Sequence, residues 1–280
     1  MSLTAKKALI IELDKKRADV KSFSDFNKYI GGVGLGLKLF QTYFDEEPIV
    51  FSIGPLNGFF PFASKTSVVL DNAGVIEDLY LGGTLSTRIK FAGVDAIVLL
   101  GKAPQKLILN IRNTDVTFEE EDTNANLLGL PGKRSVLKRA NDEIILDDYF
   151  TTQEDFLEKK FTRKNISGMV VTGTETYKPA DFGRYQEIYY RVLSQAKLIT
   201  VNKSVDPSCS NCPMGCEKSR VGELGGNVLL HSLVTCSFTE KIYSDIGIVF
   251  SCLNVLGYDY THEDIENLPK LIEEILQKTT

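Results

Sequence analysis

Residues 67–103 read SVVLDNAGVIEDLYLGGTLSTRIKFAGVDAIVLLGKA, and this stretch decides the fold class. Its two ends lie within TSVVLDN (66–72) and DAIVLLGKA (95–103), short apolar runs that stop at Asn or Gly, as β-strands do. Between them, Gly82–Gly83 and Gly93 bracket a short helix or loop. Strands therefore alternate here with brief connections.

The rest of the first two thirds of the chain follows the same pattern, interrupted by helices. Further strands are predicted in IVFSIGPLNG (49–58), KLILNIRN (106–113) and GMVVTGTE (168–175). Apolar residues spaced three and four apart predict helices within 26–44, 132–150 and 182–197. This mixture favours an α+β fold with a mixed sheet over a doubly wound parallel sheet.

The pattern changes after Val201, and we predict a domain boundary near residue 203. Residues 1–203 then form the α+β domain, and 204–280 form a cysteine loop followed by a helical segment. Two or three helices are expected within 231–259 and 262–278. The sequence leaves open whether this segment is independent or packs on the first domain.

Composition and charge exclude several classes of protein. The 280 residues carry a formal net charge of -5, which provides no basic field for nucleic acid or an anionic membrane. No run of eighteen apolar residues is present, and the N-terminus lacks the apolar region of a signal peptide. We therefore expect a cytoplasmic protein without nucleic-acid or membrane partners.

The segment CSNCPMGC (209–216) holds three of the five cysteines with the spacing C-x2-C-x3-C. Pro213 and Gly215 make it a loop on which three sulfurs can turn toward one centre, as iron–sulfur clusters and zinc require. The alternative is three free cysteines without a ligand. Candidates for a fourth ligand are Cys236, Cys252, His231 and His262, although a cysteine on an apolar helix is more often a core residue.

The stretch YIGGVGLGLKLF (29–40) concentrates four glycines: Gly31, Gly32, Gly34 and Gly36. It fails the dinucleotide-binding fingerprint, because Leu37 occupies the position of the third glycine. Two interpretations remain. The glycines let backbone amides approach a phosphate or a flat cofactor, or they let a helix pack closely on a sheet.

In this order, YIGGVGLGLKLF, SIGPLNG, the stretch 67–103 and CSNCPMGC resemble the N-terminal region of the tungsten-containing aldehyde ferredoxin oxidoreductases, over about residues 8–260. The resemblance implies an α+β platform for a bis-pterin tungsten cofactor (or its molybdopterin counterpart), followed by helices that begin with three cysteines bound to a 4Fe-4S cluster. It implies that Cys209, Cys212 and Cys216 are cluster ligands, with the family's fourth cysteine in later helical domains.

The resemblance also implies cofactor-binding residues. Gly31, Gly32, Gly34, Gly82 and Gly83 match glycines that shape the pterin-facing surface. Lys65 stands where the family usually has an arginine between cluster and pterin, and Arg191 retains one cation of a glycine-rich stretch. Lysine keeps that charge but loses the planar guanidinium fork.

The departures from the family set the expected function. Leu79, Tyr80 and Leu81 replace a hydroxyl- and amide-rich stretch near the pterin phosphates. We therefore expect an iron–sulfur electron-transfer or cofactor-platform subunit beside a larger catalytic chain, with ferredoxin or a second copy as further possible partners, and not a self-sufficient aldehyde oxidase. The alternative is a non-catalytic scaffold that has lost the tungstopterin and binds zinc or no metal.

Overall fold

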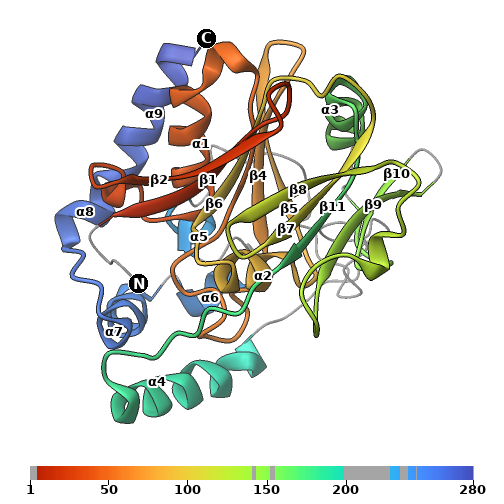
Figure 1. Ribbon diagram of the computed structural model, residues 1–280. Coiled ribbons are helices and arrows are strands. Elements are labelled where there is room, and N and C mark those ends of the chain that lie inside the picture. Colours follow the sequence, from red (N-terminus) through yellow and green to blue (C-terminus); the bar gives the residue numbers. More distant parts are fainter. Residues whose placement is uncertain are drawn as a thin grey trace.

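The computed structural model describes residues 5–140, 143–151, 155–198, 228–233, 239–243 and 245–279. In these residues the chain forms two mixed β-sheets and a layer of helices (Figure 1). The α+β prediction is confirmed, because each sheet combines one parallel pair of strands with antiparallel pairs.

The first sheet has six strands in the order β2-β1-β6-β3-β4-β5, and only β1 and β6 are parallel. Its central strand β6 is buried along its whole length, whereas the edge strand β2 is largely exposed. The strands are β1 (Lys6–Glu12), β2 (Arg17–Phe23), β3 (Ile49–Ser52), β4 (Thr66–Asn72), β5 (Val75–Leu81) and β6 (Ala96–Leu100).

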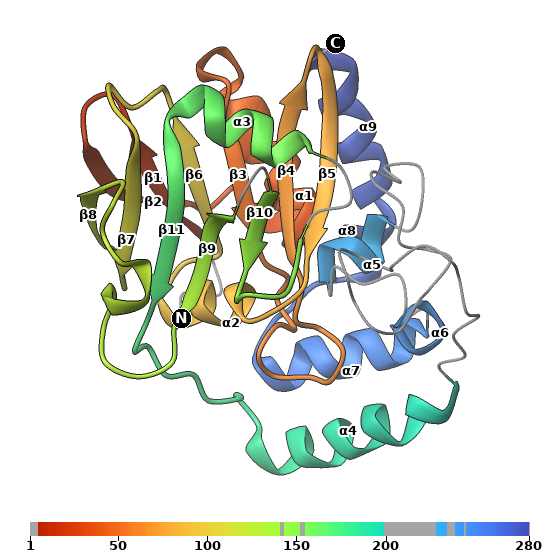
Figure 2. The same cartoon turned by 90° about the vertical axis from the view of Figure 1, so that its right-hand side faces the viewer.

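The second sheet has five strands in the order β10-β9-β11-β7-β8, with β11 and β7 parallel. The two sheets pack face to face (Figure 2), and their facing side chains share one apolar core with α2 (Leu85–Phe91) and α3 (Phe156–Lys164). The strands are β7 (Leu107–Arg112), β8 (Asp115–Glu120), β9 (Ser135–Ala140), β10 (Glu143–Leu146) and β11 (Ile166–Thr172).

The other face of the six-stranded sheet is covered by helices. The helix α1 (Gly32–Thr42) lies on β3 and β4, and α5 (Val228–Leu233) and α9 (Leu268–Thr279) pack against α1. These helices form a second core with the sheet that also includes α7 (Ile246–Leu256) and one face of α4 (Phe182–Ser194). The described helices from residue 228 onward therefore share a core with the six-stranded sheet. Two short helices complete this segment: α6 (Glu240–Tyr243) and α8 (His262–Glu266).

The predicted helix over 132–150 is wrong. Its residues form the antiparallel strands β9 and β10, with Leu137 opposite Leu146. Leu137, Ile144 and Leu146 lie toward the inter-sheet core, whereas Val136 lies on the outer face of the second sheet. The spacing of the apolar residues fits short stretches of a helix, but packing between the strands decides their structure.

The remaining expectations agree more closely with the structure, except that the described residues from 228 onward form five helices where two or three are expected. Helices are confirmed within 26–44 and 182–197, and 3-10 turns flank them: η1 (Asn27–Tyr29), η2 (Phe44–Glu46) and η4 (Gln195–Leu198). A further turn, η3 (Ala125–Leu127), lies on the outer face of the second sheet. Among the described helices, none is long and apolar enough to cross a membrane.

Candidate functional site

Strand register brings most of the predicted cofactor-binding residues to one end of the six-stranded sheet. Ser52 at the end of β3 pairs with Ser67, and Thr66 at the start of β4 pairs with Leu81 at the end of β5. Lys65 precedes β4, and Gly82 and Gly83 follow β5. The start of α1 lies at the same end, where the Gly32 amide donates to the Ile53 carbonyl at 2.9 Å. We call this the glycine end.

The glycines near α1 allow backbone to pack on backbone. A Cβ atom at Gly31 would lie 2.8 Å from the Ile53 oxygen and 3.1 Å from the Ser232 carbonyl oxygen. At Gly34 it would lie 2.5 Å from the Tyr29 oxygen and 2.9 Å from the Ser232 hydroxyl. Gly32 adopts a positive φ of 44° at the first residue of α1. The glycines therefore permit a close approach between α1, the chain after β3, and α5.

The second pair of glycines is covered by the second sheet. A Cβ atom at Gly82 or Gly83 would lie 2.7 or 2.9 Å from the ring of Phe150. Asp147 holds the cover in place, since its carboxylate accepts hydrogen bonds from the Thr84 amide at 2.8 Å and the Val136 amide at 3.0 Å. The end of β5 is thus tied to the β9–β10 region.

A buried polar group joins α5 to the sheet at the glycine end. The Tyr80 hydroxyl lies 2.5 Å from a carboxylate oxygen of Asp78, to which it donates, and 2.7 Å from Nδ1 of His231. Asp78 is fully buried and His231 is 6% exposed. From the sequence, His231 is expected either as a metal ligand or as a packed helical histidine, and Asp78 is missed. An aspartate within the apolar strand β5 was the available signal, because a buried carboxylate requires hydrogen-bond partners.

Other polar atoms at this end are buried as well. The Thr66 and Ser67 hydroxyl oxygens and the amide oxygen of Asn57 make no hydrogen bond in the described structure. The Asn57 side chain itself is fixed, because its Nδ2 donates to the Ser86 carbonyl at 2.8 Å. An ordered water or a ligand donor would satisfy these three oxygens.

The predicted metal ligands are divided. Cys209, Cys212, Cys216 and Cys236 lie outside the described residues. Cys252 is fully buried on α7, and burial raises the pKa of its thiol to about 12. It is therefore a neutral thiol at physiological pH. Over the part of the chain that the structure describes, no three His, Cys, Asp or Glu side chains are grouped to hold a metal.

Arg191, the last predicted cofactor-binding residue, lies apart from the glycines on an exposed turn of α4, which packs on α7. Its charge acts on the core beneath, where it partly offsets the effect of burial on the pKa of Cys252. The structure thus brings the glycines and Lys65 to one end of the sheet and places Arg191 on a peripheral helix.

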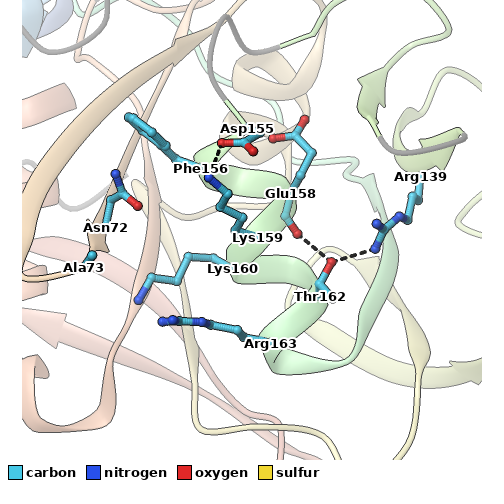
Figure 3. A pocket seen from close by; sticks show the side chains of 10 residues that line it. All are labelled: Asn72, Ala73, Arg139, Asp155, Phe156, Glu158, Lys159, Lys160, Thr162 and Arg163. Carbon is cyan, nitrogen blue, oxygen red and sulfur yellow. Dashed lines mark hydrogen bonds and ion pairs between the residues drawn. The ribbon is translucent and has the colours of Figure 1, made fainter.

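A pocket of about 560 Å³ lies at the opposite end of the six-stranded sheet, between the β4–β5 turn and α3 (Figure 3). Lys160 and Arg163 extend from α3 toward Ala73. Lys160 is buried and pairs with Asp71 at 3.2 Å and Glu47 at 3.7 Å. None of the predicted site residues that the structure describes lines this pocket.

A solved structure supports the fold. A chain of the active-site complex BamBC of benzoyl coenzyme A reductase, in complex with 1,5-dienoyl-CoA, superposes with a TM-score of 0.61 at 18% identity. The match covers 73% of this chain and 36% of that chain. At this identity the likeness concerns the fold alone.

Two sequence comparisons concern the family. A curated protein from Pyrococcus furiosus, the WOR-like subunit of an aliphatic sulfonate oxidoreductase, is 27% identical over 154 residues, which cover 49% of this chain. The match spans only 24% of that relative's length. Residues 8–173 match the sequence model of the aldehyde ferredoxin oxidoreductase N-terminal domain. Because this match covers more than half of the 280 residues, the chain belongs to the aldehyde ferredoxin oxidoreductase family.

Proposed function

We propose that this chain is an iron–sulfur electron-transfer subunit of a cytoplasmic oxidoreductase complex, built on the cofactor-platform fold of its family. One observation carries the proposal: the family domain at 8–173 is followed by Cys209, Cys212 and Cys216 in the order and spacing of the family's cluster motif. Zinc fits three thiolates equally well. The family domain beside the motif favours the cluster.

Three thiolates and one further ligand hold a 4Fe-4S cluster, which supplies one-electron transfer when bound. Cys252 is the least suitable fourth ligand, because its side chain is fully buried in the apolar core that α7 shares with the other helices. Cys236 or a residue of a partner chain is therefore the better candidate.

A larger partner chain completes the proposal. The curated relative is named as a subunit and the solved relative as part of a complex, and this chain spans about a quarter and a third of their lengths. We assign oxidation of an aldehyde with water to a carboxylic acid, together with the tungstopterin or molybdopterin, to that partner. Electrons would then pass through the cluster of this chain to ferredoxin. The alternative assembly is a homodimer of this chain, which is simpler because it contains one kind of subunit.

Metal analysis of anaerobically purified protein tests the proposal. We expect brown protein with about four iron and four acid-labile sulfide per chain. Cys212→Ser should lower both, whereas the matched control Cys252→Ala should retain them, because Cys252 lies in the core of α7. Colourless protein that contains zinc or no metal would instead support the scaffold alternative.

A further inference from the structure

The glycine end of the sheet is occupied by the chain's own helix α5. The strongest sign is Gly54, where a Cβ atom would lie 1.8 Å from the Leu233 carbonyl oxygen and 3.1 Å from that of Ser232. Gly31 and Gly34 face Ser232 at 3.1 and 2.9 Å by the same measure. Real Cβ atoms do not approach other atoms as closely as 1.8 or 2.9 Å, and 3.1 Å is already tight, so these three glycines form a seat that receives the Ser232–Leu233 end of α5.

Polar contacts hold α5 in this seat. The Gly34 amide donates to the Ser232 hydroxyl at 3.2 Å, and His231 lies 2.7 Å from the Tyr80 hydroxyl on β5. Leu230 and Leu233 are at most 1% exposed in the core shared with α1 and the sheet. The helix is thus an integral part of the helical layer, bound by apolar burial and by hydrogen bonds on two different elements.

A pterin does not fit at the predicted positions in this arrangement. A Cβ atom at Gly31 or Gly34 would meet α5 in addition to Ile53 or Tyr29, and one at Gly82 or Gly83 would meet Phe150. A flat cofactor would need the space that the Ser232–Leu233 backbone and the Phe150 ring fill. Displacing α5 would expose its buried leucines and break its polar contacts.

We infer that α5 is an internal substitute for the pterin: Gly31 and Gly34, two of the glycines implied by the family resemblance, serve here with Gly54 as a seat for the chain's own helix, and this chain binds no pterin. The inference rests on the proposed function in one respect, since it requires the pterin of the complex to lie on the partner chain. It also gives the glycines a role. They fix the helix with which the described chain resumes after the cysteine motif.

Elemental analysis of the wild-type chain is the first test. The full chain is produced in cells that synthesise the pterin cofactor and are supplied with tungstate and molybdate. We expect less than about a tenth of an equivalent of tungsten or molybdenum, the level of trace contamination for a chain without a pterin site. A stoichiometric amount of either would overturn the inference. Iron and sulfide in the same sample report separately on the proposed cluster.

Paired alanine substitutions are the second test. Gly54→Ala should lower the Tm by at least about 5 °C, because α5 must move. Gly183→Ala is the matched control, since its Cβ atom would meet only an Asp181 carboxylate oxygen at 3.8 Å, and its Tm should be unchanged or higher. Equal Tm values for the two variants would contradict a seated α5.

Hydrogen exchange of the wild-type chain keeps the inference testable if Gly54→Ala does not fold. The amides of Ser232 and Leu233 in the last turn of α5 should exchange at least about a hundredfold more slowly than those of the exposed edge strand β2, because both residues are fully buried. Exchange as fast as that of β2 would show that α5 leaves the seat readily and would refute its role as a substitute.

Discussion

The two ends of the six-stranded sheet differ in the groups that pack there. At the glycine end, backbone packs on backbone, and α5 and Phe150 cover the glycines. At the other end, a pocket of about 560 Å³ lies between the β4–β5 turn and the long charged side chains of α3. The family resemblance points to the first end, where a pocket of about 230 Å³ is lined by Lys90, whereas the pocket of about 560 Å³ lies at the second.

With α5 in the place of the pterin, a family surface would survive without remaining accessible. Glycines that match a cofactor platform are equally suited to receiving a helix, because both need a backbone without side chains. The chemistry at the two ends is nevertheless alike in one respect. Each end contains a buried lysine, Lys90 on α2 at the glycine end and Lys164 on α3 at the other.

Glycine substitutions at the two ends should separate them most strongly. Gly34→Ala places a methyl group 2.5 Å from the Tyr29 oxygen, and we expect it to lower the free energy of unfolding by about 3 kcal/mol. The Cβ atom of Gly74→Ala in the β4–β5 turn would meet no atom within 4 Å. The positive φ of 88° at this position is then the only unfavourable factor, and it should lower the free energy of unfolding by about 1 kcal/mol. Urea unfolding of both variants measures the difference.

The order of these two costs is the critical result. If Gly74→Ala proves as destabilising as Gly34→Ala, then backbone conformation and not close packing governs both ends. Close packing around α1 and α5 would then no longer distinguish the glycine end from the end with the β4–β5 turn.

The hydrogen-bonded group at the glycine end should give the next largest effect. Tyr80→Phe removes the hydroxyl that lies between Asp78 and His231, and we expect a loss of about 2 kcal/mol, because both partners stay buried. Tyr43→Phe is the control, since its hydroxyl accepts only an exposed contact from Lys21 at 3.3 Å. Similar losses for both variants in urea unfolding would argue against a structural role for the Tyr80 group.

Much of the fold could be predicted from the sequence because local and tertiary preferences agree there. The strands around Val68, Val98 and Leu109 are short apolar runs with turn residues at their ends, and they lie in the cores as expected. The β9–β10 pair was missed, since its apolar positions also fit a helical period and only pairing with β11 decides between them.

The candidate site could be predicted only in part. Motif order identified the glycines and Lys65, and strand register explains why they gather at one end. What covers them could not be predicted, because α5 and Phe150 come from segments more than 65 residues away in the sequence. Packing partners at such separations leave no local pattern.

The buried lysines should produce the smallest effect and test the likeness of the two ends. Burial lowers the pKa of Lys90 and of Lys164 to about 8, while nearby carboxylates, Asp95 for Lys90 and Glu47 for Lys164, partly oppose it. The unfolded chain, whose lysines titrate near 10.5, therefore binds more protons than the folded chain between these values. Stability should rise with pH through this window, by about 1 kcal/mol per lysine between pH 7 and 9.

Methionine variants assign this rise to the two ends. Lys90→Met and Lys164→Met should each remove about the same part of the pH dependence of urea unfolding, measured against wild type at pH 7, 8 and 9. Lys21→Met is the control, because it removes a lysine that lies exposed on the edge strand β2. If only Lys164→Met reduces the pH dependence of stability, then the surroundings of Lys90 at the glycine end compensate for the burial of its charge. The two ends would then differ in electrostatics as well as in packing.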